Sequence, residues 1–142
     1  MSQKPFKILG IEHVGIAKHG LDGISSVFSE ILGLEHSSSE IVEDQQVKTD
    51  IFDTGQGKLE FLQSTNSDSS ISRFIAKKGE GMHHVALLVD NLQPALEYLK
   101  NKGMKLIDET PRIGAEGFFI AFLDPKSTGG ILVELCEKKS QH

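Results

Sequence analysis

The sequence has little of what secreted and membrane proteins need: it holds one cysteine and no long apolar run. Cys136 has no second cysteine to pair with, so the chain cannot form an internal disulfide, and we expect a reducing, cytoplasmic compartment. A transmembrane helix needs about 20 consecutive apolar residues. No stretch approaches that length, and the opening MSQKPFKILG has no apolar secretory segment, so we expect neither a membrane span nor a signal peptide.

The chain also lacks a basic block. It has 15 Lys and Arg residues against 20 Asp and Glu residues, which gives a net charge of −5. Proteins that bind nucleic acid carry clustered positive charge for the phosphates. The charge balance therefore argues against nucleic acid as the main partner. It leaves room for an anionic small molecule, because that needs only a few local cations.

What the chain does have is an internal repeat. The phrases IEHVGIA (residues 11–17) and MHHVALL (residues 82–88) align His13 with His84, at an offset of 84 − 13 = 71. Each phrase precedes a segment with apolar residues at helical spacing, residues 21–33 and 91–103. These segments end in Gly33 and Gly103, an offset of 103 − 33 = 70. Coincidence between two amphipathic stretches is the alternative, but the shared offset favours duplication.

The second part of each half also matches. DIFDTGQGKLEFLQ (residues 50–63) and FFIAFLDPKSTGGILVELC (residues 118–136) each read as strand, turn and strand, and they align Glu60 with Glu134. With 142 residues and 38% hydrophobic residues, the chain is expected to form one soluble α+β domain. We expect module 1 at about residues 8–63, a linker and short helix at 64–80, and module 2 at about 81–137.

Two histidines and two glutamates at equivalent positions indicate a metal site. Strand alternation selects His84, not His83, as the partner of His13, and His83 is expected to be a half-exposed strand residue. A carboxylate in the middle of an apolar strand is costly unless it is paired. Imidazole and carboxylate ligands suit Zn²⁺, Co²⁺, Ni²⁺, Mn²⁺ or Fe²⁺, and two carboxylates neutralise a dication. Unrelated strand residues are the alternative. The remaining histidines are expected to be incidental: His19, His36 and His142.

The phrases IEHVGIA, GMHHVALLVDN and FLDPKSTGGILVELC resemble the vicinal-oxygen-chelate, or glyoxalase, superfamily. Within it they are most similar to the methylmalonyl-CoA epimerases, over about residues 8–137. The resemblance implies an α+β glyoxalase-like fold, in which two tandem βαβββ modules form a metal-containing half-barrel. It also implies a homodimer. Asp124 stands where that branch commonly has a histidine.

Carried over position by position, the resemblance implies four metal ligands: His13, Glu60, His84 and Glu134. The ion it implies is Co²⁺ or Zn²⁺, with Ni²⁺ or Mn²⁺ as further candidates. In one branch of the family a further carboxylate, one strand earlier than Glu60, is proposed as a base. The matching region QVKTDIF has no glutamate here, so Asp50 is the fallback acid.

The implied reaction interconverts (R)- and (S)-methylmalonyl-CoA through an enolate-like intermediate. Glu60 and Glu134, which come from different modules, are the expected acid–base pair. Lys126 and Arg112 are the expected cations for the CoA substrate, with Lys77 and Lys78 as further candidates. Phe118 and Phe119 are candidates to line the acyl pocket, Phe119 being the expected substrate contact, while core packing is expected for at least one of the two.

Three other functions remain open from the sequence. Lactoylglutathione lyase, or glyoxalase I, uses the same two-histidine, two-carboxylate ligand set. A ring-cleaving dioxygenase would use two histidines and Glu134 on iron, and Glu60 argues against it because a fourth ligand removes a position that O₂ needs. A non-catalytic ligand-binding protein of the same fold would lack the ligand set.

Overall fold

The structure is a computed structural model that describes residues 4–139, in which the chain forms two units. One unit comprises residues 13–83, and the other comprises residues 4–12 together with residues from 84 onward. Each unit contains a strand, a helical segment and then three strands along the chain, so the predicted α+β class is confirmed. Within residues 4–139, no helix is long and apolar enough to cross a membrane.

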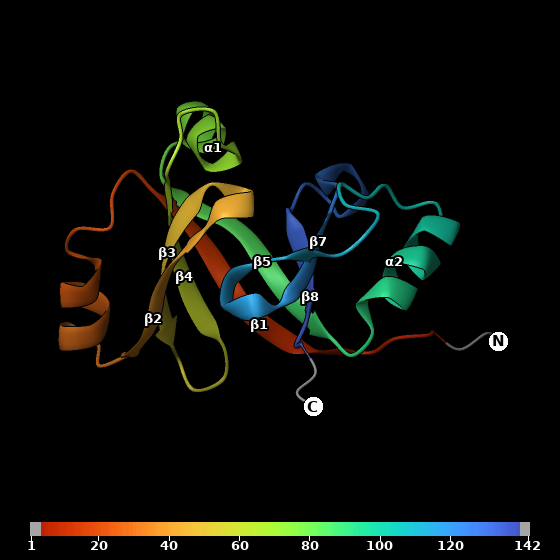
Figure 1. Ribbon diagram of the computed structural model, residues 1–142, viewed down its shortest axis with the longest axis horizontal. Coiled ribbons are helices and arrows are strands. Elements are labelled where there is room, and N and C mark those ends of the chain that lie inside the picture. The colour runs from red at the N-terminus through yellow and green to blue at the C-terminus, as the bar shows by residue number, and fades with distance from the viewer. Residues whose placement is uncertain (1–3, 140–142) are drawn as a thin grey trace. The chain divides into compact units, whose positions relative to one another are not determined.

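The sheet strands of the unit of residues 13–83 are neighbours in the order β2-β3-β4-β1 (Figure 1). Its strands are β1 (Ile8–Lys18, from His13 onward in this unit), β2 (Glu35–Val42), β3 (Val47–Asp53) and β4 (Lys58–Ser64). β2, β3 and β4 run antiparallel, whereas β1 pairs with β4 in parallel. The predicted turn between β3 and β4 is confirmed, because Thr54 N–H donates to the Gly57 carbonyl at 2.8 Å.

The first predicted helix, over residues 21–33, differs from the expectation. Its regular part is the π-helix η1 (Ser26–Ile31), in which the Leu32 N–H bonds the carbonyl five residues earlier. A π-turn holds more residues than an α-turn, so later side chains rotate away from the helical spacing read in the sequence. Ile31 is therefore 77% exposed, while Phe28 packs on the sheet. Gly33 ends the segment at φ +82°, as predicted.

Aromatic packing joins η1 to one face of this sheet. The Phe28 ring lies 4.7 Å from the Phe61 ring, and Phe61 lies 5.7 Å from Phe52, measured between centroids. Ile24 belongs to the same buried cluster. The predicted helix before the second half is also confirmed as α1 (Ser70–Lys78), which begins where the Ser69 side chain accepts the Ser72 N–H at 3.1 Å.

The other unit is built on a sheet in the order β5-β8-β7-β6. Its elements are β5 (Gly81–Val89, from His84 onward in this unit), α2 (Leu92–Asn101), β6 (Arg112–Ile113), β7 (Phe119–Leu123) and β8 (Val133–Glu137). β5 and β8 are parallel, and the other neighbours are antiparallel. Short 3₁₀ turns, η3 (Ala115–Gly117) and η4 (Pro125–Ser127), precede and follow β7. Another, η2 (Glu43–Gln45), lies between β2 and β3.

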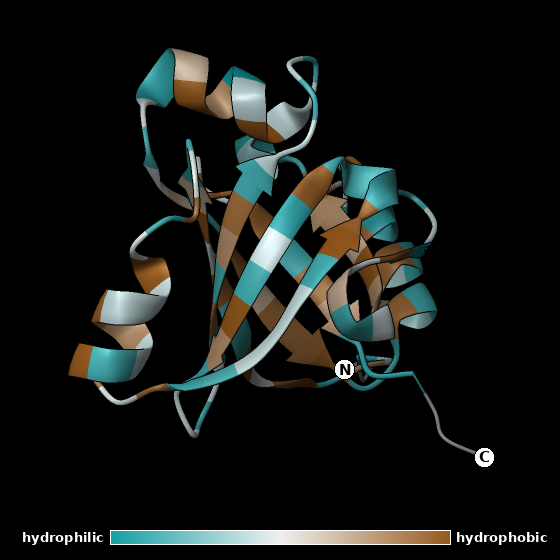
Figure 2. Ribbon diagram, turned by 60° about the vertical axis from the view of Figure 1, so that its left-hand side comes forward, coloured by the Kyte–Doolittle hydropathy of each residue, from teal (hydrophilic) through white to brown (hydrophobic). Residues whose placement is uncertain are grey.

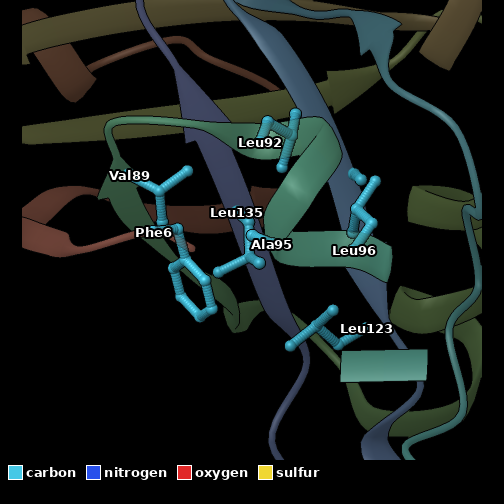
Figure 3. Close-up of a cluster of buried hydrophobic side chains, with 8 residues drawn as sticks. Phe6, Val89, Leu92, Ala95, Leu96, Leu123 and Leu135 are labelled. Atoms are coloured by element: carbon cyan, nitrogen blue, oxygen red, sulfur yellow. The ribbon is translucent and has the colours of Figure 1, made fainter. Parts of the chain in front are cut away.

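The helix α2 covers one face of this second sheet. Its apolar residues fall at helical spacing and point at the strands, as Figure 3 shows for Leu92, Ala95 and Leu96. The buried cluster around them also contains one residue of the N-terminal segment and four residues of the strands: Phe6, Val89, Ala121, Leu123 and Leu135. In Figure 2 several strands carry alternating apolar and polar bands, so these strands present two chemically different faces.

Replacing Leu96 tests this core. Leu96 is 1% exposed, so Leu96→Ala removes buried apolar contacts and leaves a cavity. We expect the free energy of unfolding to fall by about 2–5 kcal/mol, measured by urea denaturation. Gln93→Ala, at an exposed position of the same helix, is the control. A loss for Leu96→Ala no larger than that for Gln93→Ala would contradict the packing described here.

Glu80 provides a pH-dependent contact within the unit of residues 13–83. The His19 main-chain N–H donates to Glu80 Oε2 at 2.7 Å, and Lys18 Nζ lies 3.3 Å from Oε1. The hydrogen bond from His19, aided by Lys18, holds the pKa of Glu80 below its ordinary value. A folded-state pKa below the unfolded one stabilises the fold at higher pH, and this stabilisation is lost as the pH falls through the folded-state value.

We therefore expect Glu80→Gln to lower the Tm at pH 7. The difference from the wild type should shrink as the pH falls below about 4, where the carboxylate of the unfolded chain is already protonated. Thermal melts between about pH 7 and pH 3 measure this. Glu97→Gln, at an exposed position of α2, is the control. A Tm difference that does not change with pH would rule out the ionic contact.

Candidate functional site

The unit of residues 13–83 contains a buried histidine–glutamate pair. In the parallel pairing of β1 with β4, Gly15 is the partner of Glu60, and His13 lies two residues before Gly15 on the same strand face. His13 Nδ1 lies 3.1 Å from Glu60 Oε2. The two residues are only 5% and 4% exposed. The structure thus brings together the two predicted ligands of module 1.

The other unit contains the same arrangement. In the parallel pairing of β5 with β8, Ala86 is the partner of Glu134, and His84 lies two residues before Ala86. His84 Nε2 lies 3.1 Å from Glu134 Oε1, and the residues are 7% and 4% exposed. The ring of Phe122 meets the His84 ring edge-on, with centroids 5.5 Å apart and an interplanar angle of 83°.

Both pairs follow from one backbone rule. A histidine, a spacer residue and then a small residue occupy the first strand, and the small residue is the register partner of the glutamate. Gly15 and Ala86 are the small residues, and both are buried. A glycine or alanine adds little bulk between the two longer side chains, so the imidazole and the carboxylate can approach each other. The repeat seen in the sequence is therefore a repeat of structure.

The chemistry of these pairs suits a divalent cation. A buried carboxylate is costly unless an opposite charge or hydrogen bonds compensate it. Each pair offers one imidazole nitrogen and one carboxylate oxygen, which are ligand atoms for a metal ion. Nitrogen and oxygen donors of this kind suit Zn²⁺ and its transition-metal neighbours. The residues present in each unit therefore fit a metal-binding role.

The predicted CoA-binding cations lie at the start of β6, in η4 and in the last turn of α1. Arg112 is the register partner of Ile120, so it lies on the face of the sheet that carries Phe122 and Glu134. Its Nε lies 3.2 Å from Asp108 Oδ1, so its charge is partly balanced within the unit. Lys126 is exposed in η4, directly after β7. Lys77 and Lys78 are in the last turn of α1.

The structure places Phe119, a predicted acyl-pocket residue, on the face of β7 opposite Glu134. Phe119 packs against the α2 cluster with Leu123, whereas Phe122 faces the same side as Glu134, its register partner. Phe118 packs on the buried cluster that contains Phe122. The expectation that at least one of Phe118 and Phe119 packs in the core is therefore confirmed. The hairpin register of β7 and β8 is what puts Phe122 on the face of Glu134, because cross-strand partners share a face.

Asp50, the fallback acid, points away from Glu60. Ile51 is the register partner of Glu60, so Asp50 lies on the opposite face of β3. There it accepts a hydrogen bond from Ser39 Oγ at 2.5 Å, and His36 Nε2 lies 3.6 Å from its Oδ1. This position removes Asp50 as a partner of the His13–Glu60 pair.

The other histidines lie outside these pairs. His83 is half-buried, as expected, and meets the Phe74 ring edge-on at 4.9 Å. His36 lies beside Asp50, and His19 is near the end of β1, where its main chain bonds Glu80. His142 lies outside the described residues.

The chain is similar in sequence to known protein families and to individual proteins. Residues 12–122 match the Glyoxalase/Bleomycin resistance protein/Dioxygenase superfamily. The chain is 41% identical to the uncharacterized protein YqjC of Bacillus subtilis, over 93% of this chain and 95% of that protein. It is 36% identical to mitochondrial methylmalonyl-CoA epimerase of Mus musculus, over 94% and 76%. It is 31% identical to ethylmalonyl-CoA/methylmalonyl-CoA epimerase of Cereibacter sphaeroides, over 88% and 95%.

Solved structures of methylmalonyl-CoA epimerases are also similar to this chain. Methylmalonyl-CoA epimerase from Mycobacterium tuberculosis is similar with a TM-score of 0.89 and 30% identity, over 94% of this chain and 90% of that one. A methylmalonyl-CoA epimerase in complex with methylmalonyl-CoA and NH4+ is similar with a TM-score of 0.88 and 31% identity, over 94% and 97%. The predicted glyoxalase-like fold is thereby confirmed. The chain belongs to the Glyoxalase/Bleomycin resistance protein/Dioxygenase superfamily, and its named relatives are isomerases.

Proposed function

We propose that the chain is a metal-dependent epimerase that interconverts (R)- and (S)-methylmalonyl-CoA through an enolate-like intermediate. The observation that carries the proposal is the pair of equivalently built, buried histidine–glutamate contacts, one in each unit. The names of the relatives support the substrate, because they include methylmalonyl-CoA epimerases over nearly the whole chain. We also propose that the enzyme is a cytoplasmic homodimer and that each chain is a single domain.

In this proposal four side chains hold one divalent ion: His13, Glu60, His84 and Glu134. The two carboxylates neutralise the charge of the dication, so the buried site carries no net charge and its desolvation cost is lower. Co²⁺ or Zn²⁺ is the proposed ion, with Ni²⁺ or Mn²⁺ as further candidates. When bound, the ion supplies a Lewis acid for negative charge that develops on substrate oxygens.

The protein's own part is proton transfer at carbon 2. One glutamate takes the proton from carbon 2, and the electron pair of the broken C–H bond moves toward the thioester carbonyl. The intermediate is planar at carbon 2, so inversion requires that the new proton come from the opposite face. Glu60 and Glu134 are proposed for these two roles, since they come from different modules. Each carboxylate exchanges roles when the reaction runs in reverse.

The remaining residues bind the substrate and keep out water. Arg112, on the sheet face of Glu134, is proposed to contact the acyl end or the CoA phosphates, and exposed Lys126 to contact the phosphates. The apolar residues beside His84 exclude water from the reacting carbon, which strengthens electrostatic interactions there. Phe119 stays outside this set because it packs under α2.

Metal content gives the first test. We expect purified protein to carry about one divalent ion per chain, and His13→Ala or His84→Ala to lose most of it, because each change removes a ligand. Elemental analysis after dialysis measures this. His36→Ala, at an exposed histidine beside Asp50, is the control and should keep its metal. Wild-type metal content in both His13→Ala and His84→Ala would contradict the proposed ligand set.

Isotope exchange tests the acid–base pair. In D₂O the wild type should invert methylmalonyl-CoA and incorporate deuterium at carbon 2. We expect Glu60→Gln to lose inversion by about 10²-fold or more while deuterium still enters substrate of one configuration, because only one base remains. Mass spectrometry and a chiral assay follow the two processes.

Glu35→Gln, at an exposed position of β2, is the control for this experiment. Undiminished inversion by Glu60→Gln would remove Glu60 from the mechanism. A wild type that leaves methylmalonyl-CoA unchanged but converts the adduct of methylglyoxal and glutathione would replace the proposed activity with that of lactoylglutathione lyase.

A further inference from the structure

An apolar cluster shares a sheet face with the His84–Glu134 pair. Its buried members lie on β5, β7 and β8: Ala86, Ile120, Phe122 and Cys136. Strand alternation and register put all of them on the face opposite α2. The polar pair is therefore bordered by apolar side chains on this face, which also carries Arg112 on β6. A substrate group that reaches the pair must pass close to hydrocarbon.

Within this cluster, Phe122 lies directly beside Glu134 on the neighbouring strand. One row across the sheet runs Ala86, Glu134, Phe122, because Glu134 is the register partner of both neighbours. The carboxylate is thus flanked by a small side chain on one strand and by a large aromatic ring on the other. Cross-strand partners of an antiparallel pair have Cβ atoms about 4.5–5.5 Å apart. Phe122 is the bulky residue next to Glu134 in this row.

The Phe122 ring is also held in place. It is 8% exposed and meets the His84 ring edge-on, with centroids 5.5 Å apart. Aromatic pairs of this geometry are favourable and fix the relative orientation of both rings. Phe122 therefore contacts one member of the polar pair and borders the other. A rigid ring in that place limits the room beside the carboxylate.

We propose that Phe122 determines the size of the alkyl substituent that the enzyme accepts at carbon 2 of a malonyl thioester. The inference rests on the proposed function, in which Glu134 exchanges a proton with carbon 2. The substituent on carbon 2 is one bond from the reacting centre, so it must lie near the groups that border Glu134. Phe122 favours methyl over longer chains by its bulk, because the ring fills space beside Glu134 that a longer chain would need.

The test compares two substrates that differ by one methylene. Values of kcat/KM are measured for methylmalonyl-CoA and ethylmalonyl-CoA with the wild type, Phe122→Leu and Phe122→Met. One methylene in a hydrophobic pocket changes kcat/KM by about 10-fold or more. We expect the ethyl-to-methyl ratio to rise about 10-fold in Phe122→Leu, and by less in Phe122→Met, whose side chain is closer in length to phenylalanine.

Phe119→Leu is the matched control, since it makes the same change three residues away on the other face of β7. We expect it to alter stability but to leave the substrate ratio within about twofold of the wild type. The ethyl-to-methyl ratio distinguishes a size limit set by Phe122 from its contact with His84. Loss of the contact with His84 lowers the rates with both substrates alike, whereas loss of the size limit changes their ratio. Thermal melts identify which variants are folded.

Two results would overturn the inference. One is a wild-type ratio in a folded Phe122→Leu or Phe122→Met, and the other is an equal shift in Phe119→Leu. Both leave the proposed function intact, because methylmalonyl-CoA is still inverted. A wild type that inverts neither thioester would instead defeat the proposed function, and the specificity inference with it.

Discussion

Parallel strand pairing is the constraint on which the candidate site depends. In each unit a parallel register places a small residue opposite a glutamate, and a histidine two residues earlier then shares the glutamate's face. A slip by one residue would turn every side chain of the strand to the other face. The histidine and the carboxylate would then lie on opposite sides of the sheet. The apolar packing that fixes register thereby also fixes the 3.1 Å contacts of both pairs.

This register also puts the residues that pack the core and the residues of the candidate site on opposite faces of the sheet. In the unit that contains α2, Leu135 and Ala121 face the helix, whereas their neighbours Glu134 and Phe122 face the other side. Burying the first set stabilises the fold, while the second set places the buried carboxylate and an aromatic ring on the opposite face. The buried carboxylate is costly, but the imidazole beside it compensates much of that cost. The helix-covered face can therefore be optimised for packing without affecting the polar pair.

The sequence alone predicted much of this arrangement, because strand alternation and a nearly constant offset identify His13, His84, Glu60 and Glu134 without coordinates. The sequence alone did not show which face of the sheet a side chain occupies when a turn sets the register of its strand. Phe119 and Phe122 are both apolar strand residues, and only the β7–β8 pairing separates them. The π-turn of η1 was equally hidden, since apolar spacing fits an α-helix as well until the main-chain hydrogen bonds are seen.

The two halves repeat a backbone but not an environment. Glu60 has Gly15 on one side and Ile51 on the other, whereas Glu134 has Ala86 and Phe122 in the same places. The duplicated fold thus gives two equivalent carboxylates, and the residue on the antiparallel neighbour makes them different. An epimerase needs this combination, because its two proton-transfer steps are mirror-related at carbon 2 while the rest of the substrate is not. In the proposed mechanism, the equivalent glutamates serve the mirror-related steps, and their unequal neighbours accommodate the unsymmetrical thioester.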